Sequence, residues 1–217
     1  MIKTSDAGTK ARLLEVAREV FATRGVKEAT VREICAKAGA NVAAVNYHFG
    51  NKEKLLIAVL ADFLQTSQEL FPTHMGLPPE APSQDRLKAY IRSLLLKLVG
   101  TGDPLYQKLG QLFTLEMLEP SESFGIIAER YIIPQHAVLV GIVREMLPFG
   151  TEERTVQLCA AGVVGHCLLF DHARQVILRM CPEMALETLG VEVVADFVYS
   201  FALGGIERMR LVAGKAL

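Results

Sequence analysis

Apolar residues recur at helical spacing along almost the whole chain. Leu13, Ala17, Val20 and Phe21 form one such stripe within residues 9–24, spaced three or four residues apart. The same period predicts further helices over residues 52–70, 84–99, 105–118, 122–147, 151–180 and 187–212. Apolar and polar residues alternate for no more than a few positions, so the pattern predicts no strand. We therefore expect an all-α protein.

Proline and glycine mark the places where these helices should stop. Residues 72–83, PTHMGLPPEAPS, hold four prolines and one glycine, a density that no helix survives. Pro134 lies inside the helix predicted for 122–147 and should kink or split it near Ile133. Pro148, Phe149 and Gly150 separate that helix from the next.

Residues 30–49, TVREICAKAGANVAAVNYHF, predict two short helices joined by a tight turn. Thr30 is a good N-cap, and Glu33 three residues later completes a capping box. Gly39 stands where a helix usually stops in a left-handed residue, and Asn41 can cap a second helix. A helix, a turn of about four residues containing glycine and a second helix make the helix-turn-helix pattern.

The second of these helices has little to bury. Val45 and Phe49 are four residues apart and can face a core together, whereas most of the remaining residues are small or polar. Small residues let a helix backbone approach base edges, and Asn46 carries the paired donor and acceptor that suit adenine. Tyr47 and His48 can bond phosphates. The alternative is a helical hairpin that packs for structural reasons, with Asn46 merely solvated.

At these residues the chain resembles the TetR family of bacterial one-component transcriptional regulators. The resemblance covers residues 11–56 and rests on F-x-x-x-G from Phe21 to Gly25, T-V-R-E-I from Thr30, A-G at Ala38, and the closing Y-H-F-G-N-K-E. It implies a helix-turn-helix DNA-binding domain, which we place at residues 1–54, ahead of a larger helical ligand-binding and dimerisation domain at 55–217. Most family members carry Tyr where this chain has Asn46, so which side chain reads bases stays open.

The expected DNA contacts fall into two groups. Asn46, with Ala43 and Ala44 close to the backbone, should read bases, and Lys52 resembles the family's phosphate-contacting lysine. The full predicted set is Thr30, Arg32, Asn41, Val42, Ala43, Ala44, Asn46, Tyr47, His48 and Lys52. Residues 1–54 carry ten basic and six acidic residues, a net +4, against −5 for the remainder. A basic head on an acidic body fits contact with a polyanion at one end, although ordinary charge scatter could also produce it.

The last two helices are apolar over more than one face. A monomer's own core would cover part of this apolar surface and leave the rest exposed to solvent. A two-fold interface would cover the surplus, and in TetR-like proteins these helices make the dimer. GHCLLFDHAR (165–174), FALGGIERMR (201–210) and LFTLEMLEPS (112–121) resemble the CecR-like subgroup. We expect a homodimer, with a large monomeric core as the alternative. The predicted interface residues are Leu168, Phe197, Phe201, Gly204 and Gly205.

A small-molecule site is also expected in the helical body, because an apolar cavity with a few polar groups suits one. Each candidate residue could equally be plain core. The CecR-like resemblance implies control of efflux or drug-sensitivity genes, and hence a bulky, partly apolar toxic compound. The predicted ligand residues are Phe113, Glu116, Met117, Phe124, Tyr131, His166, Phe170 and Arg174.

Other chemistry has weak support. The four cysteines form no C-x-x-C pair, and no Cys/His cluster has zinc-ligand spacing, so we expect neither metal nor cofactor. Asp171, His172, His166 and Glu116 invite a hydrolase hypothesis, but adjacent helical residues point about 100° apart, so we expect no enzyme. Without a signal peptide or a long uncharged apolar run, we expect a cytoplasmic protein with no membrane contact.

The sequence thus predicts a ligand-responsive DNA-binding regulator, most simply a repressor. The rivals are an activator using the same head and a helical ligand- or partner-binding protein whose head no longer binds DNA.

Overall fold

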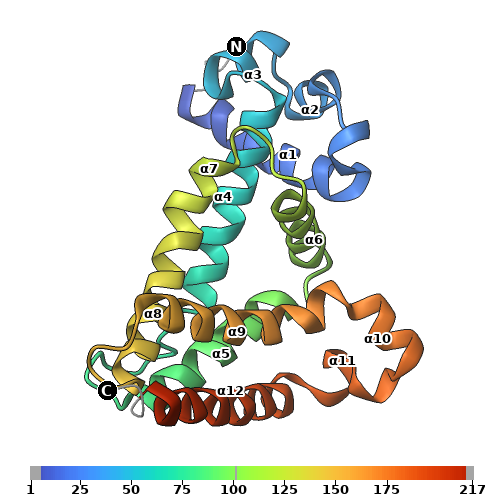
Figure 1. The fold of residues 1–217 in the computed structure, drawn as a ribbon. Helices are drawn as coiled ribbons and strands as arrows, with labels where there is room; N and C mark the ends of the chain where they lie inside the picture. Colours follow the sequence, from blue (N-terminus) through green and yellow to red (C-terminus); the bar gives the residue numbers. More distant parts are fainter. Residues whose placement is uncertain (1–5, 101, 214–217) are drawn as a thin grey trace. The chain divides into compact units, whose positions relative to one another are not determined.

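The computed structural model describes residues 6–100 and 102–213. Within these residues every regular element is helical and no strand occurs, which confirms the all-α prediction (Figure 1). The chain divides into two compact units. Unit 1 comprises Met1–Thr66 and Gly102–Tyr131, and unit 2 comprises Ser67–Thr101 and Ile132–Leu217.

Unit 1 contains the predicted helix-turn-helix and the helices that support it. Its elements are α1 (Asp6–Glu28), α2 (Val31–Ala38), α3 (Val42–Phe49), most of α4 (Lys52–Leu70), α6 (Pro104–Leu118), α7 (Phe124–Ile127) and most of a π-helix (Ala128–Ile132). Helix α1 begins three residues earlier than Thr9, the predicted start. Gly25 interrupts it with a φ of 75°, a conformation that favours glycine, at the residue where the sequence predicts the helix to end.

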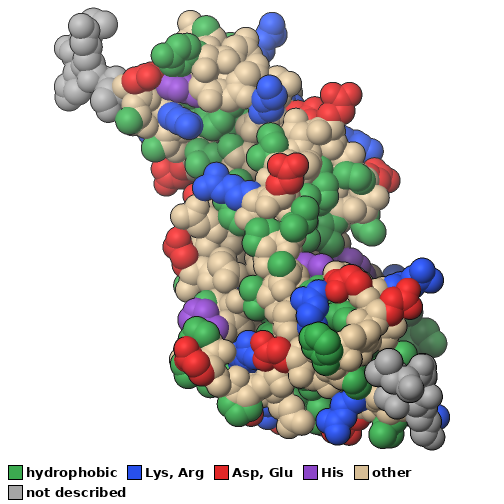
Figure 2. All heavy atoms as spheres, turned by 60° about the vertical axis from the view of Figure 1, so that its left-hand side comes forward, with side chains coloured by type: hydrophobic (Ala, Val, Ile, Leu, Met, Phe, Trp, Pro, Cys, Tyr) green, Lys and Arg blue, Asp and Glu red, His purple; other side chains and the backbone are tan. Residues whose placement is uncertain are grey.

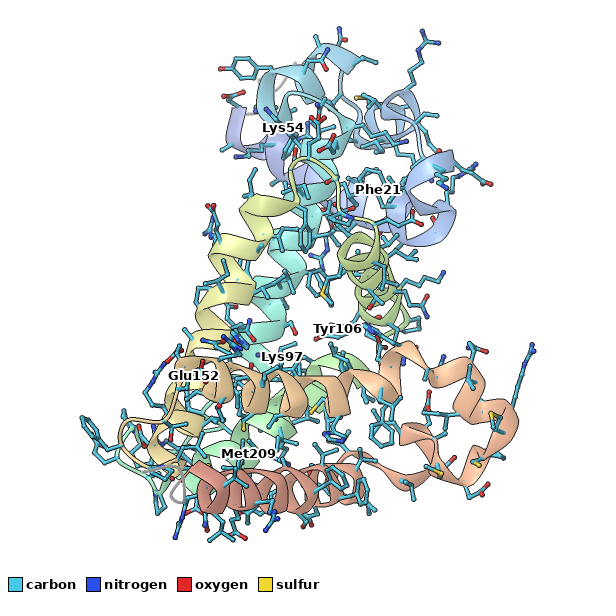
Figure 3. The ribbon with its side chains drawn as sticks, viewed as in Figure 1. Phe21, Lys54, Lys97, Tyr106, Glu152 and Met209 are labelled. Carbon is cyan, nitrogen blue, oxygen red and sulfur yellow. The ribbon has the colours of Figure 1, made fainter. Side chains whose placement is uncertain are left out.

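The predicted apolar stripe of α1 forms the centre of unit 1. Leu13, Ala17, Val20 and Phe21 are all completely buried, and α1 packs against α2, α3 and α6. Phe21 is labelled at this position in Figure 3. Burial of four apolar side chains on one face explains why this helix can hold the two short helices, which are too short to be stable alone.

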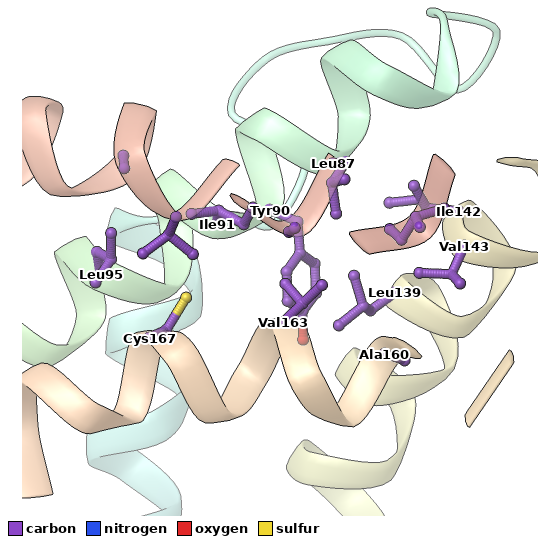
Figure 4. Packing of buried hydrophobic residues seen from close by; sticks show 14 of the residues in the cluster. Leu87, Tyr90, Ile91, Leu95, Leu139, Ile142, Val143, Ala160, Val163 and Cys167 are labelled. Atoms are coloured by element: carbon purple, nitrogen blue, oxygen red, sulfur yellow. The ribbon is translucent and has the colours of Figure 1, made fainter. Parts of the chain in front are cut away.

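Unit 2 contains the end of α4 and the remaining helices. These are α5 (Ser83–Val99), α8 (Ile133–Met146), α9 (Glu153–His172), α10 (Arg174–Met180), a 3-10 turn (Pro182–Met184), α11 (Leu186–Leu189) and α12 (Val191–Ala213). Its core lies around α5, which packs against α8, α9 and α12. Figure 4 shows Tyr90, Ile91 and Leu95 of α5 gathered with apolar residues of α8 and α9.

Three predicted helices are divided in the structure. The helix expected over 122–147 becomes α7, the π-helix and α8, with Pro134 in the first turn of α8, where its missing N–H costs nothing. The helix expected over 151–180 breaks at Ala173, where the chain bends by 66° between α9 and α10. The helix expected over 187–212 starts at Val191, because Gly190 adopts a φ of 81° and separates α11 from α12.

One described stretch, Phe124–Met146, is long and apolar enough to cross a membrane by length and composition alone, with a hydropathy of 1.4. The bent pair α9 and α10 would be a second if counted as one span. Glu129, Arg130, Arg144 and Glu145 lie within this stretch, so it holds no uncharged apolar run of the length that the sequence analysis looked for. Leu139, Ile142 and Val143 of the first stretch are buried in the core of unit 2, and 28% of its most apolar window is buried inside the structure.

Lys97 of α5 is a partly buried cation in unit 2 (Figure 3). Its Nζ lies 2.6 Å from Gln68 Oε1 and 2.9 Å from Gln135 Oε1. Burial lowers the pKa of this ammonium from 10.5 to about 8. The folded protein therefore releases the proton at a lower pH than the unfolded chain, and stability increases as the pH rises between these two values.

Replacing Lys97 by Met should remove this pH dependence. We expect the difference in free energy of unfolding, wild type minus Lys97→Met, to rise by at most about 3 kcal/mol between pH 8 and pH 10.5. Urea unfolding at several pH values measures it. The subtraction cancels other groups, such as Tyr90, whose pKa burial raises to about 12. A difference that stays flat with pH would contradict the assignment.

Candidate DNA-binding interface

The capping residues that the sequence singles out mark the start of α2 and the turn between α2 and α3. Thr30 Oγ1 accepts a hydrogen bond from the Glu33 N–H at 3.2 Å, and Asn41 Oδ1 accepts one from the Ala43 N–H at 3.1 Å. Gly39 adopts a left-handed conformation with a φ of 60°. Only half of the expected capping box is present in the described residues, because the Glu33 carboxylate pairs with Arg24 at 2.9 Å and Lys37 at 3.3 Å.

Helix α3 buries one narrow face and exposes the rest. Val45 is completely buried, and Phe49 is half-buried with Lys10 Nζ 5.9 Å from the centre of its ring. On the other side Asn46 is exposed and Tyr47 is 77% exposed. Val42 and Ala43 are also exposed, and Ala44 is half-buried. The helix therefore offers solvent a surface of small, amide and phenol side chains.

His48 lies differently from its neighbours. Its side chain is only 8% exposed, and Nε2 lies 3.3 Å from Asp6 Oδ1 at the start of α1. The ring packs edge to face against Tyr47, with 5.0 Å between the ring centres. Sequence reasoning predicted a phosphate contact for His48 and did not identify Asp6 as its partner, because no local spacing links residues so far apart in the chain.

The start of α4 lies directly after α3. Asn51 Oδ1 accepts a hydrogen bond from the Lys54 N–H at 2.8 Å and so caps the helix. Lys52 in this first turn is half-buried, whereas Arg32 of α2 and the cap residues Thr30 and Asn41 are exposed. The free N–H groups of a helix start favour an anion. Figure 2 shows Lys and Arg side chains on the face of unit 1 that it presents.

Two carboxylates hold the loop between α6 and α7. Glu53, next to Lys52, accepts a hydrogen bond from the Ser123 N–H at 2.9 Å. Glu116 of α6 is buried and accepts one from the Ser121 N–H at 2.9 Å. The hydrogen bonds from Ser123 lower the pKa of Glu53. The first turn of α4 is thus tied to residues 121–123, a link that sequence reasoning missed because it joins distant segments.

The predicted ligand residues fall in both units. In unit 1, Phe113, Met117, Phe124 and Tyr131 are half-buried, and Glu116 is engaged by Ser121. These five residues come from α6, α7 and the π-helix.

In unit 2 the remaining three were expected on the single helix predicted for 151–180, which the structure breaks at Ala173. Arg174 lies beyond the break at Ala173 and pairs with Glu187 of α11. Phe170 belongs to the hydrophobic core. The His166 ring packs edge to face against Phe201, with 4.6 Å between centres, and its buried Nδ1 has no hydrogen-bond partner within the part of the chain that the structure describes. The helix break is the physical reason for the difference.

The predicted dimer residues lie mainly on an open face. Phe197 and Phe201 of α12 are 59% and 57% exposed, and Gly204 and Gly205 are exposed beside them. Leu168 of α9 is half-buried, whereas Leu158 and Leu169 of the same helix are 66% and 51% exposed. Two neighbouring helices therefore share an uncovered apolar surface.

The remaining reactive groups are the cysteines and the Asp171–His172 pair. The four cysteines are free thiols, and burial raises the pKa of Cys167 to about 12. His172 Nε2 lies 3.9 Å from Asp171 Oδ2, too long for a hydrogen bond that would orient the ring. Among residues 6–100 and 102–213, no three His, Cys, Asp or Glu side chains group as a metal site.

Two family models match the chain. Residues 13–59 match bacterial regulatory proteins of the tetR family, and residues 83–206 match the C-terminal domain of the HTH-type transcriptional dual regulator CecR. CecR of Shigella flexneri is 30% identical over 182 residues, which cover 78% of each chain. The HTH-type regulator SrpR of Pseudomonas putida is 45% identical over 69 residues, 32% of each chain.

Solved structures agree on the fold. A transcriptional regulator from Rhodococcus sp. RHA1 superposes with a TM-score of 0.64 at 18% identity, covering 90% of this chain and 96% of the other. The tetR family model covers residues 13–59, which include α3 and its exposed surface.

Proposed function

Because this chain belongs to the TetR family of bacterial transcriptional regulators, with a C-terminal domain of the CecR type, we propose that it is a homodimeric repressor that a small molecule releases from its operator. That it is a DNA-binding transcriptional regulator follows from the family. The observation that carries the proposed DNA contact is the α3 surface, where Asn46 and Tyr47 are exposed on a helix anchored by Val45.

We propose that α3 enters the major groove of operator DNA. Asn46 would read an adenine edge, with Ala43, Ala44 and Val42 close to the bases. Tyr47 and the exposed Arg32 would grip phosphates. The other proposed phosphate contacts are Thr30, Asn41 and Lys52. His48 is better placed to act through Asp6, by holding α3 against α1.

The homodimer would form through α9 and α12, the helices that carry the uncovered apolar surface. Exposed phenylalanine and leucine side chains beside glycines suit close packing against an identical surface. A two-fold dimer presents two heads, so the operator should be a near-palindrome with half-sites about one helical turn or more apart.

The effector would bind in the helical body and favour a conformation in which the heads no longer fit the operator. The half-buried side chains of α6 and α7 are the candidate contacts in unit 1, and His166, Phe170 and Arg174 are separate candidates in unit 2. Glu53 offers a route for the signal within unit 1, since it ties the loop after α6 to the turn of α4 that holds Lys52.

For the effector we propose a bulky, partly apolar toxic compound, and for the regulated genes those of efflux or drug sensitivity. The family relatives are bacterial regulators, so we place the protein in the cytoplasm and assign it no enzymatic activity. An activator using the same head is the second candidate, because an operator-bound head can serve either direction of control.

Lys52→Ala should weaken binding to all DNA alike. Each phosphate contact contributes about 0.9 to the slope of log affinity against log salt concentration, so losing Lys52 should flatten the slope by roughly that amount for each bound head. Fluorescence anisotropy with a random-sequence duplex at several salt concentrations measures this.

Lys108→Ala is the matched control, because Lys108 is exposed on α6 outside the proposed interface. It should leave the slope unchanged. A Lys52→Ala protein that changed sequence preference but kept the wild-type salt slope would overturn the phosphate role.

A further inference from the structure

Residues 174–189 form an arm between α9 and α12 that the proposed function does not use. The arm consists of α10, the 3-10 turn and α11. Figure 1 shows it extending from the end of unit 2 where α9 finishes and α12 begins. Its contacts with the rest of unit 2 include those of α10 with α9 and of α11 with α12.

The arm is a folded element with an inner face. Ala185 and Leu186 are buried, and Leu186 and Ile177 pack into the core of unit 2. Arg174 and Glu187 form an ion pair that links α10 to α11. Thr188 Oγ1 donates a hydrogen bond to the Pro182 carbonyl oxygen at 3.0 Å. These contacts join α10, the 3-10 turn and α11 into one folded segment.

The arm also exposes large apolar side chains, which we call its outer face, beside the exposed polar residues Gln175, Arg179 and Glu183. Val176 is 56% exposed, Met180 75%, Met184 49% and Leu189 39%. Four large exposed apolar side chains within residues 176–189 form more apolar surface than scattered single residues would. Unbranched methionine side chains also adapt to an irregular partner surface.

We propose that the outer face of the arm packs against a second copy of this chain, at the far end of that copy's α9 and α12. The inference rests on the proposed dimer and adds to it a second contact outside the four-helix interface. Each arm would thus contact the partner subunit, and the two arm contacts would stabilise the dimer at both ends of the interface.

Continuity along the chain supports this occupant. Exposed apolar residues continue along the chain on both sides of the arm. Leu169 of α9 precedes Val176, and Leu189 is followed by Val193 and Phe197 of α12, where Val193 is 54% exposed. The outer face therefore prolongs the apolar surface of the proposed interface. A surface for an unrelated protein or a lipid would have no reason to be continuous with it.

Symmetry supplies the position of the contact. Helices α9 and α12 run antiparallel and lie side by side, with the arm at the end where α9 finishes (Figure 1). A two-fold axis perpendicular to these helices brings each arm over the opposite end of the second copy. At that opposite end Leu158, Leu211 and Val212 are 66%, 57% and 48% exposed. An apolar face thus meets an apolar face.

Photo-crosslinking of the full-length protein tests the contact directly. With benzoylphenylalanine in place of Met180, we expect crosslinks between two chains, with the attached peptides covering residues 153–160 or 208–213. Mixing isotopically labelled and unlabelled chains separates crosslinks between chains from those within one. Crosslinks confined to one chain, in a sample that remains dimeric, would overturn the proposal.

Glutamate substitution provides a second measurement. Met180→Glu with Met184→Glu should raise the dimer dissociation constant at least tenfold in analytical ultracentrifugation, with the circular dichroism unchanged, because both side chains are exposed in the protomer. Leu115→Glu is the matched control, since Leu115 is 61% exposed on α6, and it should leave the constant unchanged.

The outcomes separate the arm from the dimer itself. If wild type is monomeric at micromolar concentration, the proposed dimer fails and the arm contact fails with it. If Phe201→Glu dissociates the dimer and the arm variants do not, the dimer stands and only the arm contact is wrong.

Discussion

A chain with Phe197→Glu and Phe201→Glu is expected to be monomeric at micromolar concentration and to bind its operator roughly 10²–10⁴-fold more weakly than wild type. In the proposed dimer these side chains, more than half exposed in the protomer, are buried, and an unpaired carboxylate there costs several kcal/mol. The loss of operator affinity follows because two linked heads gain about this factor from effective concentration.

Analytical ultracentrifugation and anisotropy on the selected operator check the two parts. Leu118→Glu is the matched control, because Leu118 is 64% exposed on α6 in unit 1, and it should change neither value. A double variant that stays dimeric would show that α12 does not form the interface.

Asn46→Ala is expected to cost about 1–3 kcal/mol on the selected operator, a loss of roughly 5–150-fold, and to leave binding to random-sequence DNA almost unchanged. The reason is that a side chain reading a base contributes to specific binding only, whereas phosphate contacts contribute to both. Parallel titrations of the two DNAs at one salt concentration measure the ratio.

Gln107→Ala removes an exposed amide from α6 and serves as the control, with no change expected on either DNA. Equal losses on the operator and on random DNA for Asn46→Ala would mean that Asn46 does not read bases. Base reading would then fall to Tyr47, whose side chain is exposed beside it.

The sequence was most informative where structure depends on neighbouring residues. Thr30, Gly39 and Asn41 predicted the ends of α2 and α3, because caps and left-handed glycines act within a few residues. The α1 stripe was predicted for the same reason, since helical period alone decides which side chains face inward.

The features that the sequence missed join distant segments or depend on weak local signals. The His48–Asp6 and Glu53–Ser123 contacts link residues with no shared motif. The break at Ala173 has no proline or glycine to mark it, so a continuous apolar period suggested one long helix. As a result Arg174 was expected on the same helix as His166, and the sequence did not predict the arm.

The family and the roles of single residues differ in how far the sequence predicts them. The resemblance over residues 11–56 was specific enough to give the family, which the two family models confirm. The roles of individual residues are defined by contacts with DNA, a ligand or a second copy of the chain. For the DNA and dimer contacts, the exposure of Asn46 and Phe201 gives the physical basis of the proposals.

The most direct test of the central claim is selection of bound fragments from genomic DNA by the purified protein at about 150 mM salt, near physiological ionic strength. We predict enrichment of a near-palindrome whose half-sites suit a two-fold dimer, and the adjacent genes would point to the effector. Failure to enrich any sequence over random DNA, with and without candidate effectors, would contradict a regulator that acts through this head.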